Sequence, residues 1–323
     1  MNAIASQLNS LVGGSADLNP STNTALKGKG DFQPAGAGGE TIQGAVSGPW
    51  GYEGANMAFG VREHGMGGIL SGMALHGGLL PYGSTFFVFS DYMRPAIRLA
   101  SLMKLHVIYI FTHDSIAVGE DGPTHEPVEQ LFSLRVIPGL TVIRPADANE
   151  TAEAWRTAVE NKNGPTAIIL TRQNVPVMDR RRFSPANGLR RGAYILSDSS
   201  PGKPDVILIA TGSEVHLAVE VQEKLLGEGV NTRVVSMPSW ELFEQQPESY
   251  RHQILPPDIT QRVSIEAGAT LGWHRYIGRE GERIGIDHFG ASAPGNVLLK
   301  EFGFTSVNIL NRVKTLLARK RGK

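Results

Sequence analysis

The chain contains no cysteine, which excludes disulfide bridges, zinc–thiolate centres and cysteine nucleophiles from its 323 residues. No apolar run approaches the roughly 20 residues that a membrane-spanning helix needs. The first residues lack the basic start and the apolar run of a signal peptide, so we expect a cytoplasmic protein. The 31 Lys and Arg balance the 31 Asp and Glu, which argues against nucleic acid or a membrane as a partner.

The composition, with 41% hydrophobic and 19% charged residues, is typical of a globular protein long enough for about two domains. Continuous apolar runs at residues 105–111, 166–170 and 206–210 indicate buried strands. They alternate with helical patterns at 148–161 and 215–228. This order predicts an α/β fold of two domains, each with a mostly parallel sheet flanked by helices.

A polar segment broken by proline and glycine, residues 177–191, reads VMDRRRFSPANGLRR and indicates an interdomain linker. We therefore predict a first domain at 1–180, a linker at 181–191 and a second domain at 192–323. A stretch rich in Gly, Ser, Asn and Pro, at about residues 17–58, lies inside the first domain. Long loops of this kind are usually functional or disordered.

Residues 60–78 read as a helix that contains several glycines, among them Gly65, Gly67, Gly68 and Gly72. Each glycine costs about 1 kcal/mol relative to alanine inside a helix. Their number therefore indicates that the helix packs closely against the backbone of another segment.

Four segments carry candidate chemistry: residues 13–21, residues 59–66, an aromatic triplet and residues 112–130. Each has an ordinary structural interpretation when it is taken alone. Aromatic residues three apart form one face of a helix and pack in a core. A glutamate in a first helical turn is favoured by the helix dipole. The histidines show no spacing typical of metal ligands.

Taken together and in this order, the segments resemble the pyrimidine-binding domain of transketolases. The resemblance is most specific at residues 119–130, which read GEDGPTHEPVEQ, and it continues through Arg172-Gln173-Asn174. It also reaches the second domain at residues 210–214, for which we favour packing over anion binding. The resemblance implies a thiamine-diphosphate enzyme that moves two-carbon ketol units between sugar phosphates.

The resemblance assigns the coenzyme side of the site to five residues. Glu63 matches the carboxylic acid beside the pyrimidine ring nitrogen, a bond that a dry pocket strengthens. Phe86, Phe89 and Tyr92 match the aromatic walls of the aminopyrimidine pocket, with ring contacts worth about 1 kcal/mol each. Asp17 matches a residue that supports the thiazolium side.

The resemblance assigns the substrate side to five further residues. Ser21, His113 and Arg172 match the family's phosphate-binding positions, where the planar fork of an arginine bonds two oxygens at once. Asp121 matches the residue that recognises the C2 hydroxyl of the aldose acceptor. His125 matches a residue that hydrogen-bonds the reacting end of the substrate.

The family's Gly-Asp-Gly motif, which holds the coenzyme diphosphate through Mg²⁺ or Ca²⁺, is absent; Gly30-Asp31-Phe32 is the nearest sequence. A phosphate-site arginine of the family would lie just upstream of Asn2. We therefore expect the C-terminal subunit of a split transketolase. An N-terminal subunit would supply the metal and the diphosphate-binding domain, and two copies of each chain would form an α2β2 assembly.

Three alternatives share parts of this pattern. The β subunit of a 2-oxo acid dehydrogenase has the same two-domain plan, but Ser21, Arg172 and residues 119–127 favour sugar phosphates. Deoxyxylulose-phosphate synthase would not carry this form of residues 13–21. A non-catalytic transketolase-like subunit would be expected to lack Glu63 or the aromatic pocket, and both are present.

Overall fold

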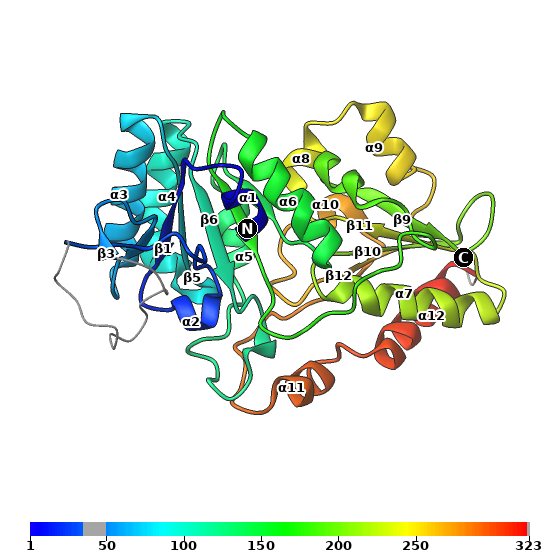
Figure 1. The fold of residues 1–323 in the computed structure, drawn as a ribbon. Coiled ribbons are helices and arrows are strands. Elements are labelled where there is room, and N and C mark those ends of the chain that lie inside the picture. The colour runs from blue at the N-terminus through cyan, green and yellow to red at the C-terminus, as the bar shows by residue number, and fades with distance from the viewer. Residues whose placement is uncertain (35–49, 322–323) are drawn as a thin grey trace. The chain divides into compact units, whose positions relative to one another are not determined.

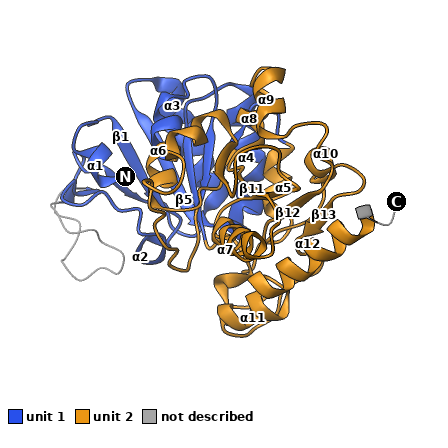
Figure 2. Cartoon of the chain, turned by 90° about the vertical axis from the view of Figure 1, so that its right-hand side faces the viewer, with its two compact units in different colours: residues 1–112, 137–141, 155–169 blue, residues 113–136, 142–154, 170–323 orange. Residues whose placement is uncertain are grey.

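In the computed structural model, which describes residues 1–34 and 50–321, the chain forms two compact units (Figure 2). Unit 1 comprises Met1–Thr112, Ile137–Thr141 and Trp155–Ile169. Unit 2 comprises His113–Val136, Val142–Ala154 and Leu170–Lys323. Part of the stretch predicted as a long loop, residues 35–49, lies outside the described residues.

The first sheet has eight strands in the order β3-β2-β4-β1-β5-β6-β8-β7 (Figure 1). Its strands are β1 (Leu11–Ser15), β2 (Asp31–Phe32), β3 (Trp50–Gly51), β4 (Asn56–Ala58), β5 (Leu80–Phe86), β6 (Ile108–Thr112), β7 (Thr141–Ile143) and β8 (Thr166–Ile169). The pairings from β3 through β8 are all parallel. The carboxyl ends of these strands therefore share one edge of the sheet, where α/β proteins place their ligands.

Two helices of unit 1 pack closely against each other at one glycine of the glycine-rich helix, and the neighbour is a side-chain Cβ instead of the backbone that the pattern predicted. The helices that include residues of unit 1 are α1 (Asn2–Ala5), α2 (Asn19–Thr22), α3 (Glu63–His76), η1 (Phe87–Phe89), α4 (Ser90–Leu102) and, in part, α6 (Ala148–Glu160). A Cβ atom added at Gly67 on α3 would lie 2.7 Å from the Cβ of Ala96 on α4. Gly68 and Gly72 face open space, so only Gly67 shows the tight contact.

The second sheet has five strands in the order β13-β12-β10-β11-β9, of which only the edge strand β9 is antiparallel. Its strands are β9 (Tyr194–Asp198), β10 (Val206–Ala210), β11 (Thr232–Ser236), β12 (Arg262–Ile265) and β13 (Glu282–Ile284). The other helices are η2 (Ile116–Val118), α5 (Gln130–Arg135), η3 (Ala186–Arg191), α7 (Glu214–Gly227), α8 (Trp240–Glu244), α9 (Glu248–Ile254), α10 (His274–Ile277), α11 (Gly295–Glu301) and α12 (Ser306–Arg321). The predicted fold class, two mostly parallel α/β sheets flanked by helices, is confirmed.

The central strand β10 separates two hydrophobic cores of unit 2. Val206, Leu208 and Ala210 face the core that contains residues of α7 and α12, which lie side by side in Figure 1. Ile207 and Ile209 face the core on the other side of the sheet, around the tryptophans of that unit. All five residues are fully buried, as the continuous apolar run required.

Candidate active site

Glu63 is a buried carboxyl at the carboxyl edge of the first sheet. It is the first residue of α3, which follows β4, and its side chain is only 5% exposed. Thr85 on β5 donates a hydrogen bond from Oγ1 to Glu63 Oε1 at 3.3 Å. Glu63 is therefore a buried carboxyl with one hydrogen bond from the neighbouring strand.

The three aromatic side chains form a stack beside the end of β5. The Phe86 and Phe89 rings lie 6.3 Å apart with an interplanar angle of 6°. The Phe89 and Tyr92 rings lie 5.8 Å apart at 17°. The rings come from β5, η1 and α4 in turn, so the interpretation of a single helical face is wrong. Phe86 is buried and Tyr92 is 64% exposed, which leaves a flat aromatic surface for a planar ligand.

Ser21 lies on α2, which begins a few residues after β1 ends at this same edge. Ser21 itself is exposed, but the next residue, Thr22, is buried and bonded to the sheet. Its hydroxyl lies 2.9 Å from that of Thr24, which in turn lies 2.5 Å from the hydroxyl of Ser84 on β5. Asp17 adopts a positive φ of 63°, an uncommon conformation for a residue with a side chain. The segment that carries Ser21 is therefore fixed to β5.

Four predicted substrate residues interact electrostatically in unit 2. His113 is buried, and this burial lowers its imidazole pKa to about 4. Arg172 lowers the pKa further, while Asp121 and Asp114 raise it and His125 lowers it. His113 is thus neutral at pH 7 and has a cationic neighbour in Arg172.

The remaining members of this group are accessible. Arg172 and Asp121 are exposed, and His125 is half-buried with its Nδ1 3.0 Å from the Thr124 hydroxyl. Unit 2 thus joins a guanidinium, a carboxylate and two imidazoles, a set of donors and acceptors suited to a phosphorylated polyol. Ser21, Glu63 and the three aromatic residues belong to unit 1.

A buried ionic cluster supports this group, and the sequence did not predict it. Arg144, which is fully buried, donates from Nε to Asp114 Oδ2 at 2.9 Å, next to His113. It also donates to the Thr211 carbonyl oxygen at 3.0 Å and forms an ion pair with Glu214. Residues 210–214 therefore have the structural role that the sequence favoured. The available sequence signal was an arginine directly after a buried apolar strand.

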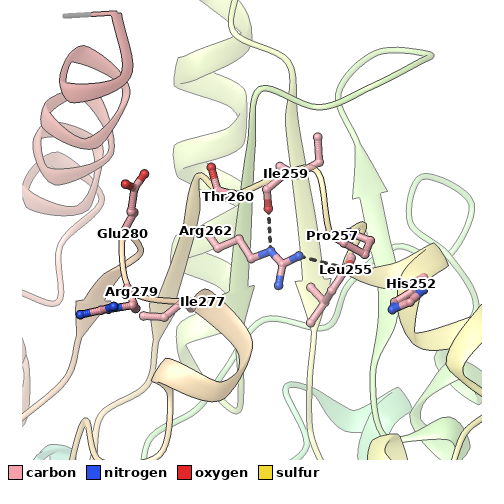
Figure 3. Close-up of a pocket in the computed structure, with 10 residues that line it drawn as sticks. His252, Leu255, Pro257, Ile259, Thr260, Arg262, Ile277, Arg279 and Glu280 are labelled. Carbon is pink, nitrogen blue, oxygen red and sulfur yellow. Dashed lines mark hydrogen bonds between the residues drawn. The ribbon is translucent and has the colours of Figure 1, made fainter. Parts of the chain in front are cut away.

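A pocket of about 340 Å³ opens elsewhere in unit 2, and none of the predicted site residues lines it (Figure 3). Its wall includes Arg262, which donates to the carbonyl oxygens of Ile259 and Pro256 at 2.8 and 2.7 Å. The same guanidinium donates to the carbonyl oxygens of Leu255 and Tyr276. The N–H donors of the guanidinium are used in these bonds. Arg262 therefore stabilises the wall of the pocket and does not form an anion site.

The described part of the chain shows neither a cluster of metal ligands nor a membrane-spanning helix. Within residues 1–34 and 50–321, no group of three or more His, Cys, Asp or Glu side chains is arranged to hold a metal ion. Over the same residues, no helix is long and apolar enough to cross a membrane.

The fold and the candidate site define a two-domain α/β protein with a buried carboxyl and stacked aromatic rings at the carboxyl edge of a parallel sheet. Residues 1–178 match the family model "Transketolase, pyrimidine binding domain". Residues 192–305 match the model "Transketolase-like TK C-terminal domain". The chain therefore belongs to the transketolase family.

Relatives and solved structures agree with this assignment. A transketolase from Geobacillus stearothermophilus is 56% identical over 99% of this chain and 46% of its own length. The structure of a transketolase from Leishmania mexicana has a TM-score of 0.88 at 41% identity, over 98% of this chain and 44% of that one. A split gene transketolase, solved as an inactive β4 tetramer, shares the fold at 24% identity, with a TM-score of 0.74 over 98% of this chain and 95% of that chain. The chain spans about half the length of the curated relatives it matches.

Proposed function

We propose that this chain is the C-terminal subunit of a two-chain transketolase. The complex transfers a two-carbon ketol unit from a ketose phosphate to an aldose phosphate with thiamine diphosphate. The observation that carries the proposal is the buried Glu63 carboxyl at the same end of β5 as the stacked rings of Phe86 and Phe89. The family match argues against the β subunit of a 2-oxo acid dehydrogenase.

The residues present fit the pyrimidine half of the coenzyme. Glu63 would hold the pyrimidine ring nitrogen, since its carboxyl is shielded from water. Phe86, Phe89 and Tyr92 would bind the ring by aromatic contact and exclude water from it. When it is bound, thiamine diphosphate supplies the carbon nucleophile that ketol transfer needs. A divalent metal, Mg²⁺ or Ca²⁺, would be held by the partner subunit.

The substrate would be held by the group in unit 2. Ser21 of unit 1 is proposed separately as a phosphate-binding residue. Arg172 supplies the positive charge for the sugar phosphate, and the neutral His113 supplies a hydrogen bond to it. Asp121 would accept a hydrogen bond from the C2 hydroxyl of the aldose. His125 would hydrogen-bond the reacting end of the sugar.

Arg172→Ala is expected to raise KM for phosphorylated sugars by about tenfold or more, because a hydrogen bond to a charged group is worth about 1.5–3 kcal/mol. Steady-state kinetics with ribose 5-phosphate and with glycolaldehyde as acceptors measure the effect. Arg190→Ala, an exposed arginine in the predicted linker, is the matched control. An equal loss on both acceptors would show that Arg172 does not bind the phosphate.

The proposed domain division is a pyrimidine-binding domain at 1–180, a linker at 181–191 and a C-terminal domain at 192–323. The family models support it, because one model ends at residue 178 and the other begins at 192. The proposed linker includes η3, Ala186–Arg191.

Two features support a partner subunit and self-association into an α2β2 complex. The curated relatives are about twice as long as the region they share with this chain, whereas the split gene transketolase is matched over 95% of its chain. Ile69 and Leu75 on α3, and Leu99 and Leu102 on α4, are each more than half exposed. Exposed apolar side chains on neighbouring helices are typical of interfaces.

A mixing experiment tests the proposal. The purified chain is expected to transfer ketol units from xylulose 5-phosphate to ribose 5-phosphate only after an N-terminal transketolase subunit and Mg²⁺ are added. Alone, it should bind thiamine diphosphate weakly and without metal dependence, as calorimetry would show. Turnover or tight metal-dependent coenzyme binding by this chain alone would contradict the two-chain proposal.

A further inference from the structure

The loop that carries Asp121 and His125 is in direct contact with a segment from the far end of the chain. Ser292 donates a hydrogen bond from Oγ to the carbonyl oxygen of Glu120 at 2.6 Å. A Cβ atom at Gly122 would lie 3.2 Å from the Cβ of Ser292. A Cβ atom at Gly119 would lie 3.2 Å from the backbone nitrogen of Gly295, so the two segments pack closely at the backbone here.

Glu126 makes the tightest of these contacts. Its side chain is 3% exposed, and a Cβ atom added at Gly290 would lie 1.6 Å from its Oε2. The Glu126 carboxyl therefore fills the space that a side chain at position 290 would need. Burial raises its pKa to about 7, and the backbone amides of Ala291 and Gly119 counter part of that rise.

The contact continues toward the start of the loop. A Cβ atom at Gly295, the first residue of α11, would lie 2.6 Å from the carbonyl oxygen of Ala117 on η2. Contacts from residues 290–295 thus occur at both ends of the loop and at its middle. A loop held at three places has few alternative conformations, since each contact removes backbone freedom.

We infer that residues 290–295 of the C-terminal domain hold the loop of residues 119–126 in one conformation, with Glu126 as the positioning residue of that contact. Asp121 and His125 are thereby kept in place for the acceptor sugar. Their substrate role rests on the proposed function, whereas the contact itself does not. The C-terminal domain thus acts on the substrate site.

Hydrogen–deuterium exchange on the purified chain tests the contact without any activity. Gly290→Ala places a methyl group against the Glu126 carboxyl and is expected to raise amide exchange in residues 117–127 by about tenfold or more. Gly227→Ala is the matched control, because a Cβ atom at Gly227 meets open space. Ser292→Ala, which adds no atoms and removes one hydrogen bond, covers the case in which Gly290→Ala does not fold. Unchanged exchange of the loop in Ser292→Ala and in folded Gly290→Ala would overturn the inference.

A double-mutant cycle identifies Glu126 as the mediator. Glu126→Ala removes the atoms that clash at position 290, so adding Gly290→Ala to it should change exchange little further. If the effects of the two substitutions on amide exchange were additive, Glu126 would not be the residue that mediates the contact.

Kinetics of the complex with the N-terminal subunit test the consequence for the substrate. Gly290→Ala is expected to raise KM for ribose 5-phosphate about fivefold or more and KM for 2-deoxyribose 5-phosphate, which has no hydroxyl at C2 for Asp121 to bind, less. If amide exchange of the loop increased while KM for ribose 5-phosphate stayed unchanged, the proposed effect of the contact on acceptor binding would be wrong. A wild-type complex without ketol transfer would refute the proposed function, and the exchange result would still decide whether the contact holds the loop.

Discussion

Glu63→Gln is expected to leave the chain folded and to lower kcat of the assembled complex by about 10²- to 10⁴-fold, the usual contribution of a positioned acid or base. Glutamine has nearly the same shape and keeps an oxygen for the Thr85 hydroxyl. It has no acidic proton to share with a pyrimidine ring nitrogen. The turnover of xylulose 5-phosphate with ribose 5-phosphate, at saturating coenzyme, measures the loss.

The matched control is Glu53→Gln, which makes the same chemical change at an exposed position of unit 1. It should have wild-type turnover and the same melting temperature as Glu63→Gln within a few degrees. Calorimetry on both complexes separates coenzyme affinity from turnover. Near-normal kcat in Glu63→Gln would remove the proposed role of this carboxyl.

The strands that the sequence predicted best are those whose burial is complete. Residues 206–210 form β10 with the predicted bounds, because an apolar run buried on both faces leaves no other arrangement. The run 105–111 was interpreted in the same way although it contains His106, and β6 begins only at Ile108. Leu105 instead donates its N–H to the Ala100 carbonyl oxygen and closes the end of α4. Periodicity does not distinguish a buried cap residue from a buried strand residue.

The residues of the candidate site also differ in how far the sequence alone could identify them. Glu63 and the aromatic residues were assigned only through the resemblance of several segments taken together, and their coenzyme roles stay predictions. Arg144 could not be predicted, because its partners Asp114 and Glu214 are 30 and 70 positions away in the sequence. The contact of Glu120 with Ser292 spans 172 positions. Such pairs depend on how the chain folds, and a single sequence does not record them.

Arg144→Met is expected to destabilise unit 2 by about 3–5 kcal/mol, because removing one partner of a buried ion pair leaves the other charge without compensation. Methionine fills much of the same volume, so the loss is mainly electrostatic. Asp114 and Glu214 would both remain as buried carboxyls that have lost their guanidinium. Urea unfolding followed by circular dichroism gives the free energy of unfolding.

The control for this variant is Arg156→Met, which removes an arginine from an exposed pair with Glu160. Exposed pairs four residues apart on a helix contribute about 0.3–0.5 kcal/mol, so this variant should unfold almost as the wild type does. Asp114 directly follows His113, so the Arg144 variant should also increase the rate of amide exchange around that histidine. A free energy of unfolding within 1 kcal/mol of the wild-type value would show that the cluster contributes little to the stability of unit 2.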